Sequence, residues 1–152
     1  MTDFWKFACL GVALALCTSV LPASAQRIVP AGYDTYYFSG TTADPINASI
    51  TAGSPGRMGD TVQQADNILN KLQAMLTKNG LSFGDVFAAH VFLVGDPVKG
   101  GEIDFAGLNG EWAKRFGTPE QPNRPSRSAF QVKLPTPGAL VEIELVAAKK
   151  AN

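Results

Sequence analysis

Apolar side chains recur every three to four residues in two stretches of the chain, which predicts two amphipathic helices. The first is expected to begin at Asp60-Thr61 and to stop at Asn79-Gly80, since glycine tolerates the left-handed conformation that ends a helix. Thr61 and Gln64 have the spacing of a capping box. The second helix should follow Asp104 as its N-cap and end before Gly117. The two apolar stripes are Ala65, Ile68, Leu69, Leu72, Met75 and Leu76, and Phe105, Leu108, Trp112 and Phe116.

Three other stretches predict strands. Residues 35–38 are aromatic and β-prone and stop at Ser39-Gly40. Residues 41–59 are rich in glycine, proline and asparagine and are expected to be mostly loop, with room for a short strand at residues 48–50. Residues 86–94 are almost all apolar, so this strand needs cover on both faces. The helices can cover one face, and the missing second layer is a first indication of oligomerisation.

Strict alternation at the C-terminal end predicts a β-hairpin. Ser128, Phe130 and Val132 alternate with polar neighbours, and after a Pro-Thr-Pro-Gly turn at residues 135–138 a second alternating run covers residues 141–147. The order of elements then predicts an α+β fold, with one mixed sheet and two helices packed on one of its faces.

The first 25 residues have the pattern of a secretory signal peptide. A short polar start with Lys6 precedes an apolar run over residues 7–21, and the small residues of Pro22-Ala23-Ser24-Ala25 mark cleavage before Gln26. The apolar run is too short to span a bilayer comfortably. We therefore expect an exported protein, periplasmic or secreted, whose mature part is one domain over residues 26–152, with no membrane association after cleavage.

Composition narrows the chemistry further. The chain carries 13 basic and 13 acidic residues, and the predicted signal contains one of each, Lys6 and Asp3. An even balance without a basic run argues against a nucleic-acid partner. Both cysteines, Cys9 and Cys17, fall in the signal, so the mature chain has no thiol for a disulfide, a nucleophile or a metal site. A histidine-based metal site is also disfavoured, because the mature chain has one histidine and no cysteine.

Few residues remain that could act chemically. The single histidine, His90, lies inside the apolar strand, where a buried or interface role is favoured over a catalytic one. Arg127 shares a face with Gln131 on one alternating strand, and the other strand offers Glu142 and Glu144. A solvated, charge-paired face and a carboxylate-binding arginine with a glutamate that activates water both fit this spacing.

The C-terminal segments resemble a known family. RSAFQV at residues 127–132, Leu134-Pro135 and ALVEIE at residues 139–144 are similar to the C-terminal signature of the RidA (YjgF, reactive intermediate deaminase) family. Upstream, the central strand at residues 85–93, the second helix from Asp104 to Asn109, Gln64 and the Ser39-Gly40 pair also match, so the resemblance spans about residues 35–148.

The resemblance implies a homotrimer like that of chorismate mutase, in which three sheets form an inner barrel with helices outside and pockets between subunits. It implies that Arg127 binds the carboxylate of a small substrate and that Glu142 places the attacking water. It implies no metal and no organic cofactor. Ser128, the backbone at Ala129, Gly40 and Asn109 would bind substrate. Tyr33, six residues before Ser39, would stand in for the tyrosine of the family's Gly-Pro-Tyr segment.

The function implied is that of a 2-iminobutanoate/2-iminopropanoate deaminase-like hydrolase, which converts reactive 2-aminoacrylate-like enamines and imines to 2-oxo acids and ammonia. The alternative is a non-catalytic trimeric module that binds small carboxylate metabolites in the periplasm. A ribonuclease, an activity ascribed to some relatives, is disfavoured by the neutral charge and the single histidine.

Overall fold

The computed structural model describes residues 27–54 and 56–151, and the predicted signal peptide, residues 1–25, lies outside them. No helix among the described residues is long and apolar enough to cross a membrane. The elements, in chain order, are β1 (Tyr33–Thr42), α1 (Thr61–Lys78), the 3₁₀ turn η1 (Phe83–Asp85), β2 (Val86–Leu93), the 3₁₀ turn η2 (Pro97–Lys99), α2 (Phe105–Ala113), β3 (Ser126–Gln131) and β4 (Val141–Lys150).

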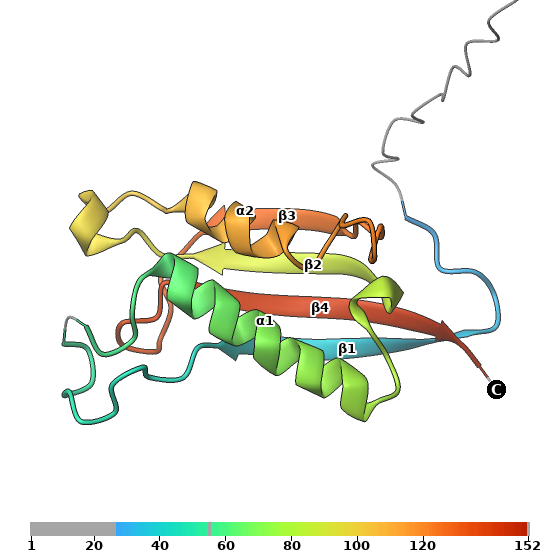
Figure 1. Cartoon of the computed structure of the whole chain (residues 1–152), viewed down its shortest axis with the longest axis horizontal. Helices are drawn as coiled ribbons and strands as arrows, with labels where there is room; N and C mark the ends of the chain where they lie inside the picture. The colour runs from blue at the N-terminus through green and yellow to red at the C-terminus, as the bar shows by residue number, and fades with distance from the viewer. Residues whose placement is uncertain (1–26, 55, 152) are drawn as a thin grey trace, which may run out of the picture.

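The four strands form one mixed sheet in the order β1-β4-β2-β3. β4 is antiparallel to both β1 and β2, and β3 is parallel to β2. Both helices lie over the same face, α1 across β1 and β4 and α2 across β2 and β3 (Figure 1). The α+β class with two helices on one face is therefore confirmed.

The core lies between this covered face and the helices. Alternate side chains of β4 point into it and are buried, as are those of the α1 stripe facing them. Burying one such aliphatic side chain stabilises the fold by about 1.5–3 kcal/mol. The central members are Ile68, Leu69, Leu72, Leu76, Val141, Ile143, Leu145 and Ala147.

Helix α1 begins one residue earlier than its predicted capping box. Asp60 is the N-cap, and its side chain and that of Gln63 form the reciprocal capping bonds. Gln64 is instead fully buried, donates to the carbonyls of Gly59 and Gly138 at 3.0 Å, and accepts from the Leu140 amide at 2.8 Å. Its side chain thus ties the start of α1 to the loop before β4.

The predicted C-terminal hairpin is wrong. β3 and β4 do not pair with each other, because β2 lies between them. Alternation assigns side chains to the two faces of a sheet but does not identify the neighbouring strand. The apolar β2 takes the interior position, where both of its edges are paired.

The N-terminal half also differs from expectation. β1 is longer than predicted at both ends, since pairing with β4 starts at Tyr33 and resumes at Thr41 after an irregularity at Ser39-Gly40. Residues 48–50 form turns rather than a strand. The Asn47 carbonyl accepts from the Ile50 amide at 3.2 Å, and the Asn47 side chain accepts from the Ser49 amide, which holds the backbone in a turn.

Candidate functional site

Arg127 lies on the helix-covered face of the sheet, beneath α2. In the strand register it is opposite Ala89, which in turn is opposite the fully buried Leu145, so the three share one face. The Arg127 guanidinium donates from Nη2 to Asn109 Oδ1 at 2.6 Å. Its Cζ atom lies 4.8 Å from the ring centroid of Trp112 and 5.7 Å from that of Phe105. Three side chains of one helix therefore hold a single arginine.

The electrostatics of Arg127 suit the binding of an anion. Burial lowers the pKa of the guanidinium from its usual value, because the charged form loses hydration. An arginine nevertheless stays protonated in proteins. Its Nη1 atom is buried and has no hydrogen-bond partner among the residues that the structure describes. A carboxylate that satisfied this donor would form a charge-assisted hydrogen bond.

The local sequence explains how α2 surrounds the arginine. Phe105, Asn109 and Trp112 are four and three residues apart, which places them on one face of a helix. Asp104 fixes the start of that helix by accepting from the Gly107 amide at 3.0 Å. The apolar stripe predicts only a core role for Phe105 and Trp112. The signal for a site on this helix is an asparagine between two aromatic residues at helical spacing.

Glu142 lies on the other face of the sheet. Its register partners are Phe92 on β2 and, one strand further, Phe130 on β3, and the rings of Phe92 and Phe130 stack with centroids 6.1 Å apart. The irregularity in β1 brings Gly40 against the Glu142 carboxylate. A Cβ atom at Gly40 would overlap Glu142 Oε1, so only glycine permits this approach.

Within one chain the two predicted catalytic residues are therefore separated. Arg127 points to the helix-covered face and Glu142 to the open face, with β2 between their strands. The structure brings Arg127 together with Asn109, and Glu142 together with Gly40. We call these two clusters the arginine half and the glutamate half.

The remaining predicted residues lie around these halves. Ser128 and His90 are opposite each other on the open face, and Ala129 lies on β3, an edge strand of the sheet. His90 is exposed rather than buried, and its Nδ1 lies 3.4 Å from a carboxylate oxygen of Glu144. No group of three or more His, Cys, Asp or Glu side chains within residues 27–54 and 56–151 is arranged to hold a metal.

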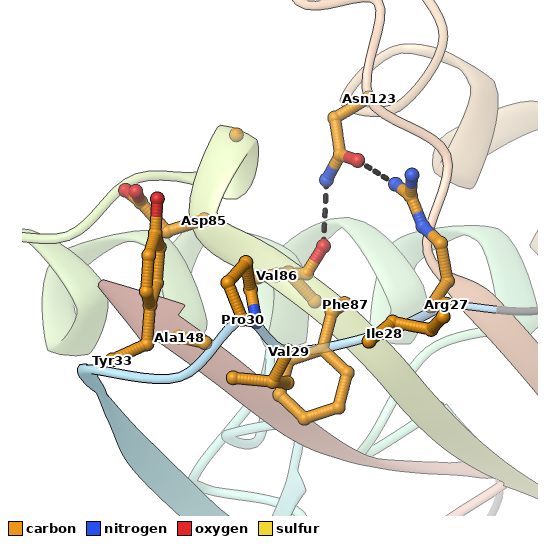
Figure 2. A pocket seen from close by; sticks show the side chains of 11 residues that line it. Arg27, Ile28, Val29, Pro30, Tyr33, Asp85, Val86, Phe87, Asn123 and Ala148 are labelled. Atoms are coloured by element: carbon orange, nitrogen blue, oxygen red, sulfur yellow. Dashed lines mark hydrogen bonds between the residues drawn. The ribbon is translucent and has the colours of Figure 1, made fainter. Parts of the chain in front are cut away.

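Tyr33 lies in a separate cavity of about 570 Å³ (Figure 2). Tyr33 and Asp85 appear at one end of the view in Figure 2, and Arg27, hydrogen-bonded to Asn123, appears at the other. Tyr33 is seven residues from Gly40 along β1, which corresponds to about 23 Å of strand. Arg127 and Glu142 do not line this cavity.

Comparisons with known proteins place this geometry in a family. The family model described as endoribonuclease L-PSP matches residues 22–149. Protein DfrA of Myxococcus xanthus is 30% identical over 127 residues, covering 83% of this chain and 84% of the relative. A RutC family protein of Haemophilus influenzae is 37% identical over 92 residues, covering 60% of this chain and 65% of the relative.

Solved structures agree in fold. An uncharacterized protein from Pseudomonas aeruginosa superposes with a TM-score of 0.57 at 29% identity, over 76% of this chain and 83% of that one. A member of the YjgF protein family from Neisseria meningitidis gives a TM-score of 0.56 at 24% identity, over 78% and 82%. The chain therefore belongs to the endoribonuclease L-PSP family, also named YjgF or RidA.

Proposed function

We propose that this protein hydrolyses small, carboxylate-bearing enamines and imines of the 2-aminoacrylate class to 2-oxo acids and ammonia, at a site assembled between subunits of a homotrimer. The observation that carries the proposal is the arginine half. Arg127 is half-buried, fixed by Asn109 and Trp112, and has an unsatisfied donor, Nη1, within the described part of the chain. A fixed, desolvated guanidinium is suited to hold a planar carboxylate.

The chemistry needs little more than positioning. After an enamine tautomerises to its imine, water adds to the C=N carbon and a proton reaches the nitrogen. The resulting amino alcohol then loses ammonia and leaves the 2-oxo acid, with no change of oxidation state. A glutamate carboxylate can orient the water and accept its proton. Glu142, resting against the Gly40 backbone, is the group proposed for this role.

A site between subunits follows from the separation of the two halves. One chain presents Arg127 and Glu142 on opposite faces of its sheet, so one substrate can meet both only if they come from two copies. The open face also exposes apolar surface: Tyr37 is 80% and Phe130 48% exposed. Burying such side chains against a second copy is favourable.

The first test compares ammonia release from freshly generated 2-aminoacrylate by the wild type and by Arg127→Ala. Losing a charge-assisted carboxylate contact should lower kcat/KM by about a hundredfold or more. Arg124→Ala, an exposed arginine three residues earlier, is the matched control and should retain full activity. Equal ammonia release by the wild type and Arg127→Ala would exclude an Arg127-dependent mechanism.

The second test examines whether the two halves come from different chains. At substrate concentrations well below the wild-type KM, Arg127→Ala and Glu142→Gln should each retain about a hundredth of the activity or less. Their mixed trimers nevertheless contain sites with one intact arginine and one intact glutamate. Random mixing of equal amounts should restore about a quarter of wild-type activity. No recovery in trimers shown by mass spectrometry to be mixed would place both groups in one chain.

The alternative function is a trimeric binding module for small carboxylates with little turnover. The separation of Arg127 from Glu142 also favours this alternative. The arginine half is complete within one chain, so it can bind a carboxylate without Glu142. Calorimetric binding of pyruvate that needs Arg127, together with no ammonia release above background, would support this alternative.

We also propose that the protein acts outside the cytoplasm after removal of residues 1–25. Mass spectrometry of the protein recovered from the expressing cells should give an N-terminus at Gln26. An unprocessed Met1 in all of the protein would contradict export by this route.

The even charge balance and the single histidine make a nucleic-acid substrate the less favoured choice.

A further inference from the structure

A second cavity lies at the end of the sheet opposite Tyr33, where three loops meet. Residues within 46–54, 56–63, 94–98 and 134–140 enclose about 580 Å³, within the range of small-molecule sites. These loops gather at the left end of the sheet in Figure 1, away from the C-terminus. Neither Arg127 nor Glu142 lines the cavity.

The walls of this loop cavity are mostly apolar. Met58, Ala139 and Leu140 are buried, and Val98, 83% exposed, stands at its rim. At Gly138 the backbone itself forms part of the wall. Its φ of 82° favours glycine, and the Cβ atom of any other residue there would lie 3.0 Å from Met58 Cγ. The cavity is therefore shaped for an apolar body.

The charges at the loop cavity have one sign. Among the described lining residues the charged side chains are Asp60 and Asp96, and both are acidic. Lys99, on the same loop as Asp96, is engaged with Asp104 at 2.9 Å. The pKa of Lys99 is raised, first by that hydrogen bond and further by the charges of Asp104, Asp96 and Asp60. The surroundings therefore attract cations.

Asp96 has a binding capacity that the fold does not use. It is 2% exposed, and its Oδ1 accepts from the Val98 amide at 3.0 Å. Its Oδ2 is buried and has no hydrogen-bond partner among the described residues. A buried carboxylate oxygen without a donor is unfavourable, because it has lost its hydrogen bonds to water. Asp96 lines the cavity, so an ammonium group bound there can supply the missing donor.

We propose that the loop cavity binds a small organic cation, a protonated primary amine on an aromatic or branched apolar body, with its ammonium group at Asp96. The apolar body would occupy the space between Met58, Leu134 and Leu140. This site is independent of the reaction proposed for Arg127 and Glu142.

The experiment titrates the full chain with phenethylammonium, 2-phenylethanol and 3-phenylpropanoate, which share an aromatic body and differ in charge. The ammonium ion should bind at least about tenfold more tightly than the alcohol, and the carboxylate most weakly. In NMR spectra, binding should change the backbone amide chemical shifts of Gly95, Asp96 and Val98 and of residues 138–140. Equal affinities for the three probes, no binding of the ammonium ion at millimolar concentration, or shifts centred on Asn109 would each overturn the proposal.

Two variants sharpen the test. Asp96→Asn keeps the oxygen that caps Val98 but removes the charge, and should lower the affinity for phenethylammonium to that for the alcohol. Glu102→Gln, which removes an exposed carboxylate from the same loop, is the matched control and should bind normally. Leu134→Trp should fill the cavity and lower the affinity for both phenethylammonium and 2-phenylethanol. Binding that is unchanged in both Asp96→Asn and Leu134→Trp would exclude the site, and unchanged binding by Arg127→Ala is expected.

Discussion

The arginine half and the glutamate half differ in how far one chain completes them. Arg127 is enclosed by Phe105, Asn109 and Trp112, all from α2 of its own chain. Glu142 lies on the open face of the sheet. Its carboxylate approaches the backbone of Gly40, where glycine leaves the space that a side chain would fill. The first half is preorganised for a ligand, whereas the second is a group left free to act.

This difference has a consequence for kinetics. Groups that hold a ligand equally in the ground state and in the transition state affect KM, whereas groups that act only in the reaction affect kcat. We therefore expect changes around Arg127 to raise KM and changes around Glu142 to lower kcat. Each of the first three predictions below can break this division.

Glu142→Gln should have the largest effect. An amide cannot accept the proton of the attacking water, so kcat should fall by about a hundredfold or more while KM changes little. Steady-state ammonia release measures both parameters. Glu144→Gln is the control, because Glu144 is on the same strand and face but pairs with His90. A rise in KM with kcat intact would assign Glu142 to binding instead.

Asn109→Ala should raise KM by about tenfold, because Arg127 loses its hydrogen bond to Asn109 Oδ1 and with it a fixed position. The kcat value should be nearly unchanged. Asn70→Ala is the matched control, since Asn70 Oδ1 accepts from a different arginine, Arg115, at 2.9 Å. If both variants behave like the wild type, the α2 side chains do not preorganise Arg127.

Gly40→Ala should lower kcat severalfold. The new methyl group would occupy the place of Glu142 Oε1, and the flexible glutamate would turn away. Gly110→Ala has open space around its new methyl group and provides a control for adding a side chain. Full activity of Gly40→Ala would mean that the observed position of the Glu142 carboxylate is not the active one.

The fold was largely predictable because each element carries its own periodicity. The α1 stripe, the Asn79-Gly80 stop and the alternation of residues 141–147 report on local geometry, and the structure confirms them except at Met75, which is 38% exposed. Strand neighbours are set by tertiary packing, so the sequence could not reveal that β2 separates β3 from β4. The wrong hairpin made the strand of Arg127 a direct neighbour of the strand that carries Glu142 and Glu144.

The candidate site was predictable as a set of residues but not as an arrangement. The pairing of Arg127 with Asn109 and of Glu142 with Gly40 depends on the register of strands far apart in the chain. The contact of Trp112 with Arg127 was not predicted, because the sequence pattern of a core aromatic residue is the same as that of one that packs on an arginine. Tyr33, placed by resemblance, lies at the far end of β1 from Gly40.

The smallest effect is expected at Asp104, the N-cap of the helix that holds Arg127. Removing the cap in Asp104→Ala should destabilise the fold by about 1 kcal/mol, measured by chemical denaturation at pH 7. The matched control is Glu102→Ala. Glu102 is an exposed acid that precedes the helix and caps no helix in the described structure, so this change should have little effect on the free energy of unfolding.

The same residue should make stability depend on pH in a known direction. The hydrogen bond from Lys99, then that from the Gly107 amide, lowers the pKa of Asp104 below its usual 3.8. A lowered carboxyl pKa means that the unfolded state binds the proton more readily, so this stabilisation is complete above about pH 5 and is lost as the pH falls through the folded pKa.

Asp104→Asn keeps the cap oxygen but removes the charge. The difference in stability between wild type and Asp104→Asn should therefore be steady from pH 7 to 5 and shrink towards pH 3. A difference that stays constant down to pH 3 would mean that the Asp104 charge does not stabilise α2, and that the helix beneath which Arg127 lies depends on neutral capping alone.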